Sequence, residues 1–431
     1  MLSLSKALRA AALVLLCTAT PVMAATADSG DSAWILTSTA LVLFMTLPGL
    51  ALFYGGLVRA RNFLSVFVHC FIIACVASIS WAAFGYGLAF GPDMHGLIGT
   101  IDAPWLMGLS DRLRDGLTIP ENLFALYQMS FAIITPALVV GAFPERVNFP
   151  YVLLFALLWP LLVYVPVAHW LWGNGWLATW GARDFAGGIV VHTTAGISSL
   201  VAAIMIGKRK GFPTTLALPH SPAMTMIGAG MLWVGWFGFN GGSALVAGAP
   251  AAQAMIATHL AACAGALLWS LLEWRKIRKA TSIGIATGAI AGLATVTPAA
   301  GYISAGGGVL LGLVGSLCCF AAVHLVKSKW KLDDSLDVFA VHGVGGMVGA
   351  ILLAIVALPA LGGNDLGTGL NLGAQLEVQA LAIGVVALWS AVMTWIITQI
   401  SKIMAPLRVD VEAEYDGLDI ATHGERAYEL G

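Results

Sequence analysis

Charged residues are so rare along this chain of 431 residues that they divide it into long uncharged segments. The uncharged segments are 32–58, 62–92, 122–144, 147–182, 185–207, 211–272, 280–326, 338–364 and 378–401. A helix needs about 20 apolar residues to cross a bilayer, so 211–272 and 280–326 must each contain two spans. Backbone polar groups in lipid must pair inside the protein, which restricts the spans to helices. The pattern predicts an all-α polytopic membrane protein with eleven transmembrane helices.

The composition agrees with this prediction and excludes several other classes of protein. The chain is 59% hydrophobic and 10% charged, whereas a soluble domain has about 25% charged residues. A net charge of −1 without a long basic run argues against nucleic acid as a partner. The six cysteines show no C-x-x-C spacing and lie in apolar stretches. We expect small buried thiols, with no disulfide, metal or cofactor.

The first 24 residues have the pattern of a cleaved signal peptide. Lys6 and Arg9 precede the apolar run AAALVLLCTA, and Val22-Met23-Ala24 supplies a small-residue cleavage site. An additional membrane helix is the alternative, but an apolar core of about ten residues is too short to span. We therefore expect a signal peptide over 1–24, a membrane domain over 25–408 and a cytoplasmic tail over 409–431.

Basic residues are concentrated on one side of the predicted topology. Sixteen lie in alternate loops and the tail: Arg59, Arg61, Arg146, Lys208, Arg209, Lys210, Arg275, Lys276, Arg278, Lys279, Lys327, Lys329, Lys331, Lys402, Arg408 and Arg426. The other side has only Arg112, Arg114 and Arg183. Loops with excess Lys and Arg stay in the cytoplasm. This predicts a multi-pass protein of the inner membrane with its N-terminus outside and its C-terminus inside.

Similar motifs recur in the two halves of the chain. ALFYGG near the end of the first span resembles WFGFNGG in the sixth, and DFAGGIVVH in the fifth resembles DSLDVFAVH in the tenth. Five helices per repeat would invert the second half relative to the first. The repeats are expected over about 32–210 and 211–358, with the eleventh helix outside them. His192 and His342 would then meet near the middle of the bilayer.

Ionisable groups at this depth mark a function by default. A single histidine on an apolar helix is most often hydrogen-bonded packing, but a repeat-related pair favours one functional site. Two neutral imidazoles can share one hydrogen bond and present their other nitrogens to a lumen. Asp184, at the start of its helix, has two readings that both stay open. One is capping of the helix N-terminus, and the other is a direct attraction for cations.

Several long motifs in one order make the chain similar to the ammonium transporter family, closest to its bacterial members. The motifs are FYGGLVR, QMSFAIITPALVVGAFPERV, DFAGGIVVH, GWFGFNGGSA, GAIAGLATVTPAAGYI and DVFAVHGVGG. The resemblance implies a homotrimer with one pore in each subunit and no catalytic activity. Spacing alone does not distinguish its aromatic residues from packing residues or interface anchors.

Residue roles follow from the resemblance, motif by motif. Phe131 and Phe239 resemble a stacked pore gate, and His192 and His342 resemble the paired pore histidines. Trp172, Phe131 and Ser243 resemble the outer recruitment site, and Asp184 resembles the acid needed for substrate entry. Two residues after Trp172, bacterial relatives often have glycine, whereas this chain has Asn174. This departure bears most on the affinity of the outer site.

These residues suggest capture of ammonium, loss of a proton, and passage of ammonia along the histidines, with methylammonium as an analogue. The rival readings are a haem protein with His192 and His342 as axial ligands, an ammonium sensor, and a channel for carbon dioxide. A sensor usually has a fused signalling domain, and only about 23 residues follow Arg408. The sequence contains no nucleophile–base spacing and no metal cluster, so it does not suggest an enzyme.

The polar, acidic composition after Arg408 by itself favours a disordered tail. The motif GLDIATHGE, however, resembles the family's ordered regulatory tail. The resemblance assigns the regulatory contacts to Gly417, Leu418, Asp419, His423, Gly424 and Glu425. It also implies that a PII-type nitrogen signalling protein binds there and blocks the inner mouth of the pore.

Overall fold

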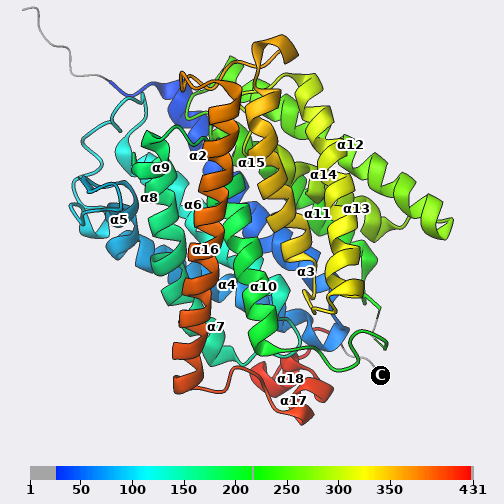
Figure 1. The fold of residues 1–431 in the computed structure, drawn as a ribbon. Coiled ribbons are helices and arrows are strands. Elements are labelled where there is room, and N and C mark those ends of the chain that lie inside the picture. The colour runs from blue at the N-terminus through cyan, green and yellow to red at the C-terminus, as the bar shows by residue number, and fades with distance from the viewer. Residues whose placement is uncertain (1–25, 216–217, 429–431) are drawn as a thin grey trace, which may run out of the picture.

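The protein is a bundle of long helices, with two short helices of the C-terminal tail packed against one end (Figure 1). The computed structural model describes residues 26–215 and 218–428. Within these ranges, ten helical rods are long and apolar enough to cross a membrane. The predicted signal peptide, residues 1–24, lies outside the described residues.

The first half of the bundle contains five helical rods, several of them interrupted by short π-helical or 3₁₀ turns. In chain order the helices are α2 (Ser29–Phe44), α3 (Ala51–Leu57), α4 (Phe63–Ser80), α5 (Tyr86–Phe90), α6 (Glu121–Val139), α7 (Phe149–Trp159), α8 (Val165–Trp172), α9 (Trp176–Thr179) and α10 (Thr194–Ile206). π-Helical turns occupy Met45–Leu50, Trp81–Gly85, Pro160–Tyr164 and Gly188–Thr193. The 3₁₀ turns are Ala60–Asn62, Pro104–Leu106 and Val140–Ala142, and the strands β1 (Asp93–Met94) and β2 (Ile98–Gly99) form an antiparallel hairpin.

The second half continues the bundle and ends in the tail. Its helices are α11 (Pro222–Trp236), α12 (Ala249–Ile277), α13 (Ser282–Val296), α14 (Ala305–His324), α15 (Val344–Val356), α16 (Leu372–Met404), α17 (Val411–Asp416) and α18 (Leu418–His423). π-Helical turns occupy Phe237–Gly241, Leu325–Lys329 and Phe339–Gly343, and a 3₁₀ turn occupies Pro359–Leu361.

The segment 280–326 contains two helices as predicted, but the first of them is short. α13 has 15 residues, which at about 1.5 Å per residue gives about 22 Å. This is less than the roughly 30 Å of a bilayer's hydrocarbon core. Most of α13 is buried against neighbouring helices, so it does not need the length of a lipid-facing span. The structure therefore has ten long helices and a shorter one in its described part, and the count of eleven spans stays a prediction.

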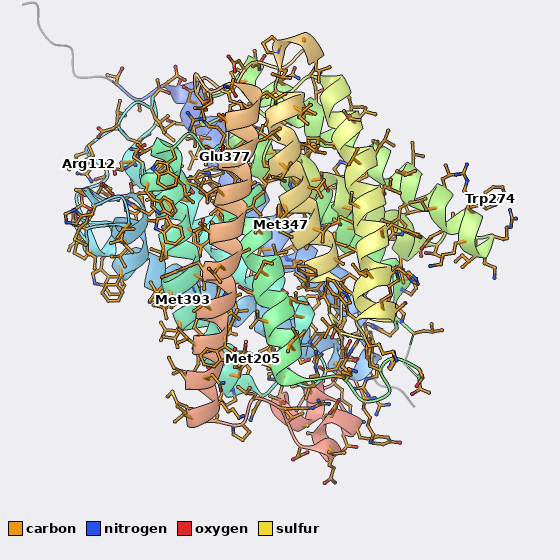
Figure 2. The ribbon with its side chains drawn as sticks, in the orientation of Figure 1. Arg112, Met205, Trp274, Met347, Glu377 and Met393 are labelled. Carbon is orange, nitrogen blue, oxygen red and sulfur yellow. The ribbon has the colours of Figure 1, made fainter. Side chains whose placement is uncertain are left out.

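The interior and the periphery of the bundle differ in burial. α6 is buried along nearly its whole length, whereas most of α16 is exposed. The exposed positions of α12 and α16 include large apolar side chains such as Leu267 and Leu388. Figure 2 shows Glu377 and Met393 along α16, and Trp274 at the free end of α12. Exposed apolar side chains along such helices are what a lipid-facing surface requires. Of the five described cysteines, all free, Cys70 and Cys319 are buried, but Cys75 is exposed.

A buried arginine connects the loops at the tail end of the bundle. The guanidinium of Arg146 donates to Gly207 O at 2.8 Å, Ser335 Oγ at 2.7 Å and Ala142 O at 2.9 Å, and also to Pro144 O and Asp333 O. Burial lowers the pKa of Arg146 to about 10, opposed by the carboxylate of Asp333. Arg146 therefore stays charged at neutral pH and joins segments that lie nearly 190 residues apart in sequence.

Candidate functional site

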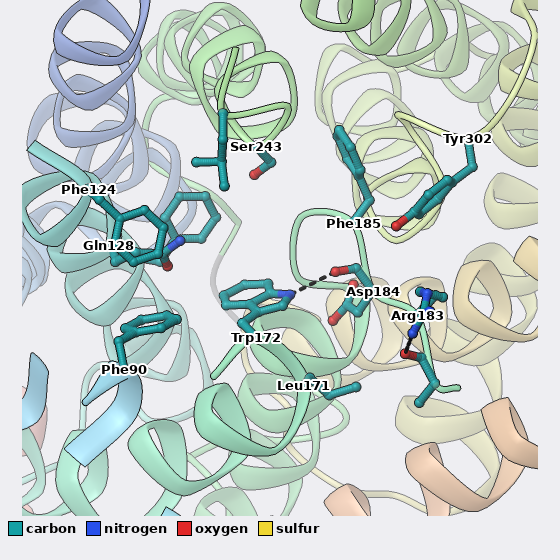
Figure 3. Close-up of a pocket in the computed structure, with 13 residues that line it drawn as sticks. Phe90, Phe124, Gln128, Leu171, Trp172, Arg183, Asp184, Phe185, Ser243 and Tyr302 are labelled. Carbon is teal, nitrogen blue, oxygen red and sulfur yellow. Dashed lines mark hydrogen bonds between the residues drawn. The ribbon is translucent and has the colours of Figure 1, made fainter. Parts of the chain in front are cut away.

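A pocket of about 310 Å³ is lined by 13 residues (Figure 3). It brings together all four predicted recruitment residues, namely Trp172, Phe131, Ser243 and Asp184. They come from α8, from α6, from the segment after α11, and from the loop before α10. Figure 3 shows Trp172 with its indole N–H directed at Asp184, and Phe185 and Tyr302 across the pocket from Phe124 and Gln128.

The indole of Trp172 is held in place by a hydrogen bond and a ring contact. Its Nε1 donates to the backbone oxygen of Asp184 at 2.7 Å, and its ring meets Phe131 edge-on at 5.8 Å between centroids. Ser243 Oγ donates to Phe239 O at 2.8 Å. Asn174, the departure from the family pattern, is exposed and has φ +63°, a conformation that asparagine adopts more readily than most residues. It is not among the residues that line the pocket.

Asp184 is a buried helix cap. Its Oδ1 accepts from Gly187 N and Gly188 N at 3.0 and 2.7 Å, and its Oδ2 accepts from Ile189 N and Val190 N at 2.7 and 2.8 Å. Four N–H groups at a helix N-terminus have no partner within the helix, and this one carboxylate satisfies four. The geometry favours the capping role, because both oxygens accept from backbone N–H groups.

Asp334 does the same for the helix that carries His342. Its carboxylate accepts from Val338 N at 3.0 Å, Phe339 N at 2.8 Å and Ala340 N at 3.3 Å. The sequence alone does not predict this cap, since Asp334 only begins the motif DSLDVFAVH there. The common Asp-x₇-His spacing was the available signal, since it placed both acids at the same offset from their histidines.

The two histidines meet, as the repeat predicted. His192 Nδ1 and His342 Nδ1 are 3.3 Å apart, with ring centroids 5.2 Å apart and an interplanar angle of 29°. Both side chains are buried, and both lie in π-helical turns, which often occur at functional sites. Because two Nδ1 atoms face each other, one must donate and the other accept. His192 Nε2 has no partner among the described residues.

Glycines allow the two helices to approach this closely. A Cβ atom on Gly196 would lie 2.2 Å from the Cα of Gly343. A Cβ atom on Gly346 would lie 2.5 Å from Gly188 O and 2.6 Å from the Cβ of His192. Gly196 and Gly346 are the glycines four residues after each histidine, so a larger residue at either position would separate the imidazoles.

A column of rings leads from the pocket to the histidine pair. Phe131 lies on Phe239 at 4.4 Å with an angle of 38°, and Phe239 stacks on His192 at 6.0 Å with an angle of 19°. With Trp172 and His342 at its two ends, the column joins five of the predicted residues. The two phenylalanines separate the outer pocket from the imidazoles.

Sequence reasoning missed Trp236, whose indole lies beside both histidines. Its ring is 5.5 Å from that of His192 and 6.5 Å from that of His342, with an interplanar angle of 2° to the latter. Trp236 Nε1 donates to Thr297 Oγ1 at 2.9 Å. The available signal was its position three residues before Phe239, because residues three apart lie on one helix face.

The tail forms two helices that pack against the bundle. The carboxylate of Asp419 accepts from Leu64 N at 3.1 Å and from Ser65 N at 2.8 Å, capping the N-terminus of α4. Leu418 N donates to Asn62 Oδ1 at 2.8 Å. Gly417 has φ +100° and Gly424 has φ +71°, which suits the glycine at each end of α18. Glu425 N donates to Asp419 O at 3.2 Å.

His423 closes the tail contact through an aromatic cluster. Its ring meets Phe149 edge-on at 5.4 Å and lies 6.4 Å from His69 of α4. Burial lowers the pKa of His423 below its ordinary value, although the carboxylates of Asp419 and Glu425 oppose the shift. His423 Nε2 and His69 Nδ1 are buried without a partner in the described chain. The docked tail therefore holds a neutral His423.

Comparison with known proteins identifies relatives along nearly the whole chain. The family model described as the Ammonium Transporter Family matches residues 33–428. An ammonium transporter of Aquifex aeolicus is 44% identical over 406 residues, covering 94% of each chain. One of Bacillus subtilis is 43% identical over 404 residues, covering 93% of this chain and 98% of its own.

Solved structures resemble the chain over similar lengths. The structure titled Sensor Amt Protein has a TM-score of 0.85 at 28% identity, covering 91% of this chain and 98% of its own. Candida albicans Mep2 has a TM-score of 0.83 at 35% identity, covering 90% and 88%.

We expect Asp184→Ala to lower the free energy of unfolding by about 1–3 kcal/mol, because it leaves buried N–H groups unpaired. Asp184→Asn keeps one acceptor oxygen and should lower it less. Thermal unfolding in detergent measures both, with Asp111→Ala, at an exposed position, as the control. Unchanged unfolding in both variants, accompanied by loss of transport, would instead assign the role to the charge of Asp184.

We expect docking of the tail to weaken as the pH falls below about 6.5, the ordinary histidine pKa. Above that pH His423 is neutral whether the tail is docked or free. Below that pH, His423 takes up a proton first in the free tail, because its pKa is lower when the tail is docked. Undocking therefore becomes more favourable as the pH falls. His69, Asp419 and Glu425 are the titratable groups that face His423 or act on its pKa.

Hydrogen–deuterium exchange over 411–423, corrected for intrinsic pH dependence, measures this between about pH 7.5 and about pH 5.5. The wild-type chain should lose protection over this range, and His423→Gln should retain more of it. The same pH dependence in both chains would rule out His423 as the titrating group.

Proposed function

The chain belongs to the ammonium transporter family, and we propose that it captures ammonium in the outer pocket, removes a proton and conducts ammonia past the histidine pair. It is a multi-pass membrane transport protein rather than an enzyme. The observation that carries the proposed route is the unbroken column from Trp172 through Phe131 and Phe239 to His192 and His342.

Capture relies on cation–π attraction at the mouth of the route. Aromatic faces attract a partly desolvated cation by about 0.5–2 kcal/mol, and Trp172 and Phe131 line the pocket together. This is enough to concentrate ammonium there but far less than the cost of moving a dehydrated ion through an apolar lumen. The phenylalanine pair, buried below the pocket, is where a charged ion stops.

Ammonium can proceed beyond this point because it can lose its charge. Potassium has nearly the same size but no proton to release, so the same barrier excludes it. Ammonia needs only modest polar contacts, and the histidine pair provides them along the apolar route. Imidazoles also exchange protons near neutral pH, so the pair is suited to move the released proton separately.

We also propose the finer topology that the sequence analysis predicted. Eleven spans with a 5+5 inverted repeat would make Asp184 and Asp334 equivalent caps, which their matching hydrogen bonds support. The N-terminus would lie outside the inner membrane after cleavage of the signal peptide, and the tail would lie in the cytoplasm. Three copies would assemble with one pore each.

The docked tail is the proposed site of regulation. Its contacts reach the loop before α4 and the loop after α10, where Lys210 N donates to Glu414 Oε1 at 3.1 Å. A PII-type signalling protein that binds the tail would therefore act on the same end of the bundle as these loops. A sensor that binds ammonium but barely conducts it is the second candidate, supported by the resemblance to the structure titled Sensor Amt Protein.

We expect purified protein in liposomes to respond to a pulse of ammonium, and both lumenal pH and membrane current measure the response. A rise in lumenal pH without current means that ammonia passes alone. A current means that the proton follows, and both results support transport. No response from correctly inserted protein would contradict transport and favour the sensor.

The variant His192→Ala, His342→Ala tests the histidine part of the route. Removing both imidazoles widens the lumen and takes away the contacts that suit ammonia better than an ion. We expect the double variant to lose most of its preference for ammonium over potassium in the same liposomes. Selectivity equal to that of the wild type would show that the histidines do not discriminate.

A further inference from the structure

Gln128 has a buried amide oxygen without a hydrogen bond to any described part of the protein. The residue lies on α6 with 8% of its surface exposed, and its Oε1 is buried and unpartnered. It lines the outer pocket together with Trp172 and Ser243. An unpaired buried amide is unfavourable, so its place at a pocket wall suggests that a guest completes its bonding.

The position of Gln128 on α6 directs it to the same pocket as Phe131. The two residues are three apart, which places them on one face of the helix. Figure 3 shows Gln128 beside Phe124, and Gln128 and Trp172 both line the pocket. A cation resting on the aromatic faces of Trp172 and Phe131 is therefore within the space that the amide borders.

Three other polar side chains of the pocket, those of Asp184, Arg183 and Ser243, are less able to accept a hydrogen bond from such a cation. Both oxygens of Asp184 accept from backbone N–H groups. Arg183 is a cation that already donates to backbone oxygens. Ser243 Oγ donates to Phe239 O, which leaves lone pairs for a guest. Gln128 brings the amide oxygen, a stronger acceptor, and a 180° rotation of the amide turns Oε1 from its buried position towards the pocket.

We propose that the Gln128 side chain accepts a hydrogen bond from captured ammonium and makes the outer pocket prefer ammonium over alkylated ammonium ions. Ammonium has four N–H donors and no acceptor. Cation–π contacts replace part of its hydration without using those donors in a directed way. The amide oxygen takes one N–H directly, whereas an alkyl group in that position leaves the amide unpaired. The inference rests on the proposed transport function and adds a specificity residue to its capture step.

The variant Gln128→Met tests this by removing the amide while nearly keeping the volume. We expect the KM for ammonium to rise about tenfold with little change in maximal rate, because a capture contact is lost and the route beyond it is intact. The KM for methylammonium should rise less, so that the ratio of the two KM values moves towards one. Gln128→Glu keeps acceptor oxygens at the same reach and should retain a low KM for ammonium.

Uptake by proteoliposomes at graded ammonium and methylammonium measures these values, with thermal unfolding measured in parallel. Leu126→Met, on the exposed side of α6, is the matched control, and Trp172→Leu reports on the capture site itself. A raised KM in Trp172→Leu with wild-type values in Gln128→Met would overturn the role of Gln128 alone. A lower maximal rate and melting temperature in Gln128→Met, with an unchanged KM ratio, would show a structural role instead. Absence of saturable uptake by the wild type would overturn the proposed function itself.

Discussion

The contact between two helices that start at buried aspartates determines where the pore residues lie. Asp184 and Asp334 each satisfy the first N–H groups of their helix, so these helix ends need neither water nor a neighbouring loop. Gly196 and Gly346 then bring the backbones together, and the imidazoles of His192 and His342 meet as a result. Phe131 and Phe239, Trp236 and the pocket with Trp172 are arranged around this crossing.

Along the proposed route, the polarity changes in steps that suit a substrate able to lose its charge. The pocket combines aromatic faces with an amide and a hydroxyl group. The side chains of the phenylalanine pair that follows have no hydrogen-bonding group, and the imidazole of His192 stacks on the second of them. An ion that keeps its charge loses solvation at the phenylalanine pair and regains little of it at the imidazoles. A neutral amine loses much less.

Much of this arrangement followed from the sequence, because it rests on local and repeated patterns. The scarcity of charge located the helices, and the repeated Asp-x₇-His spacing predicted that His192 and His342 would meet, which the structure confirms. The roles of Phe131, Phe239 and Trp172 came from resemblance, since one aromatic residue in a helix looks like any other. The structure places them in one column.

Other features needed the three-dimensional structure. α13 can be short because it is buried among other helices. The absence of charge in its segment does not reveal this burial. Trp236 is recognised as a candidate residue only because the structure places it beside the histidine pair. Gln128 is recognised only because its amide oxygen has no partner at the wall of the pocket. The tail shows the same limit, because its acidic composition favoured disorder while its buried contacts hold two helices in place.

The facing Nδ1 atoms of His192 and His342 require that the two imidazoles form a neutral pair with a single proton between them. Nitrogen-15 NMR of histidine-labelled protein in bilayers at neutral pH detects this proton. We expect one protonated and one unprotonated Nδ1, with coupling between them across the hydrogen bond. Imidazolium signals from both rings, or two protonated Nδ1 atoms, would contradict it, because the facing nitrogens would then repel each other and the route would carry fixed charge.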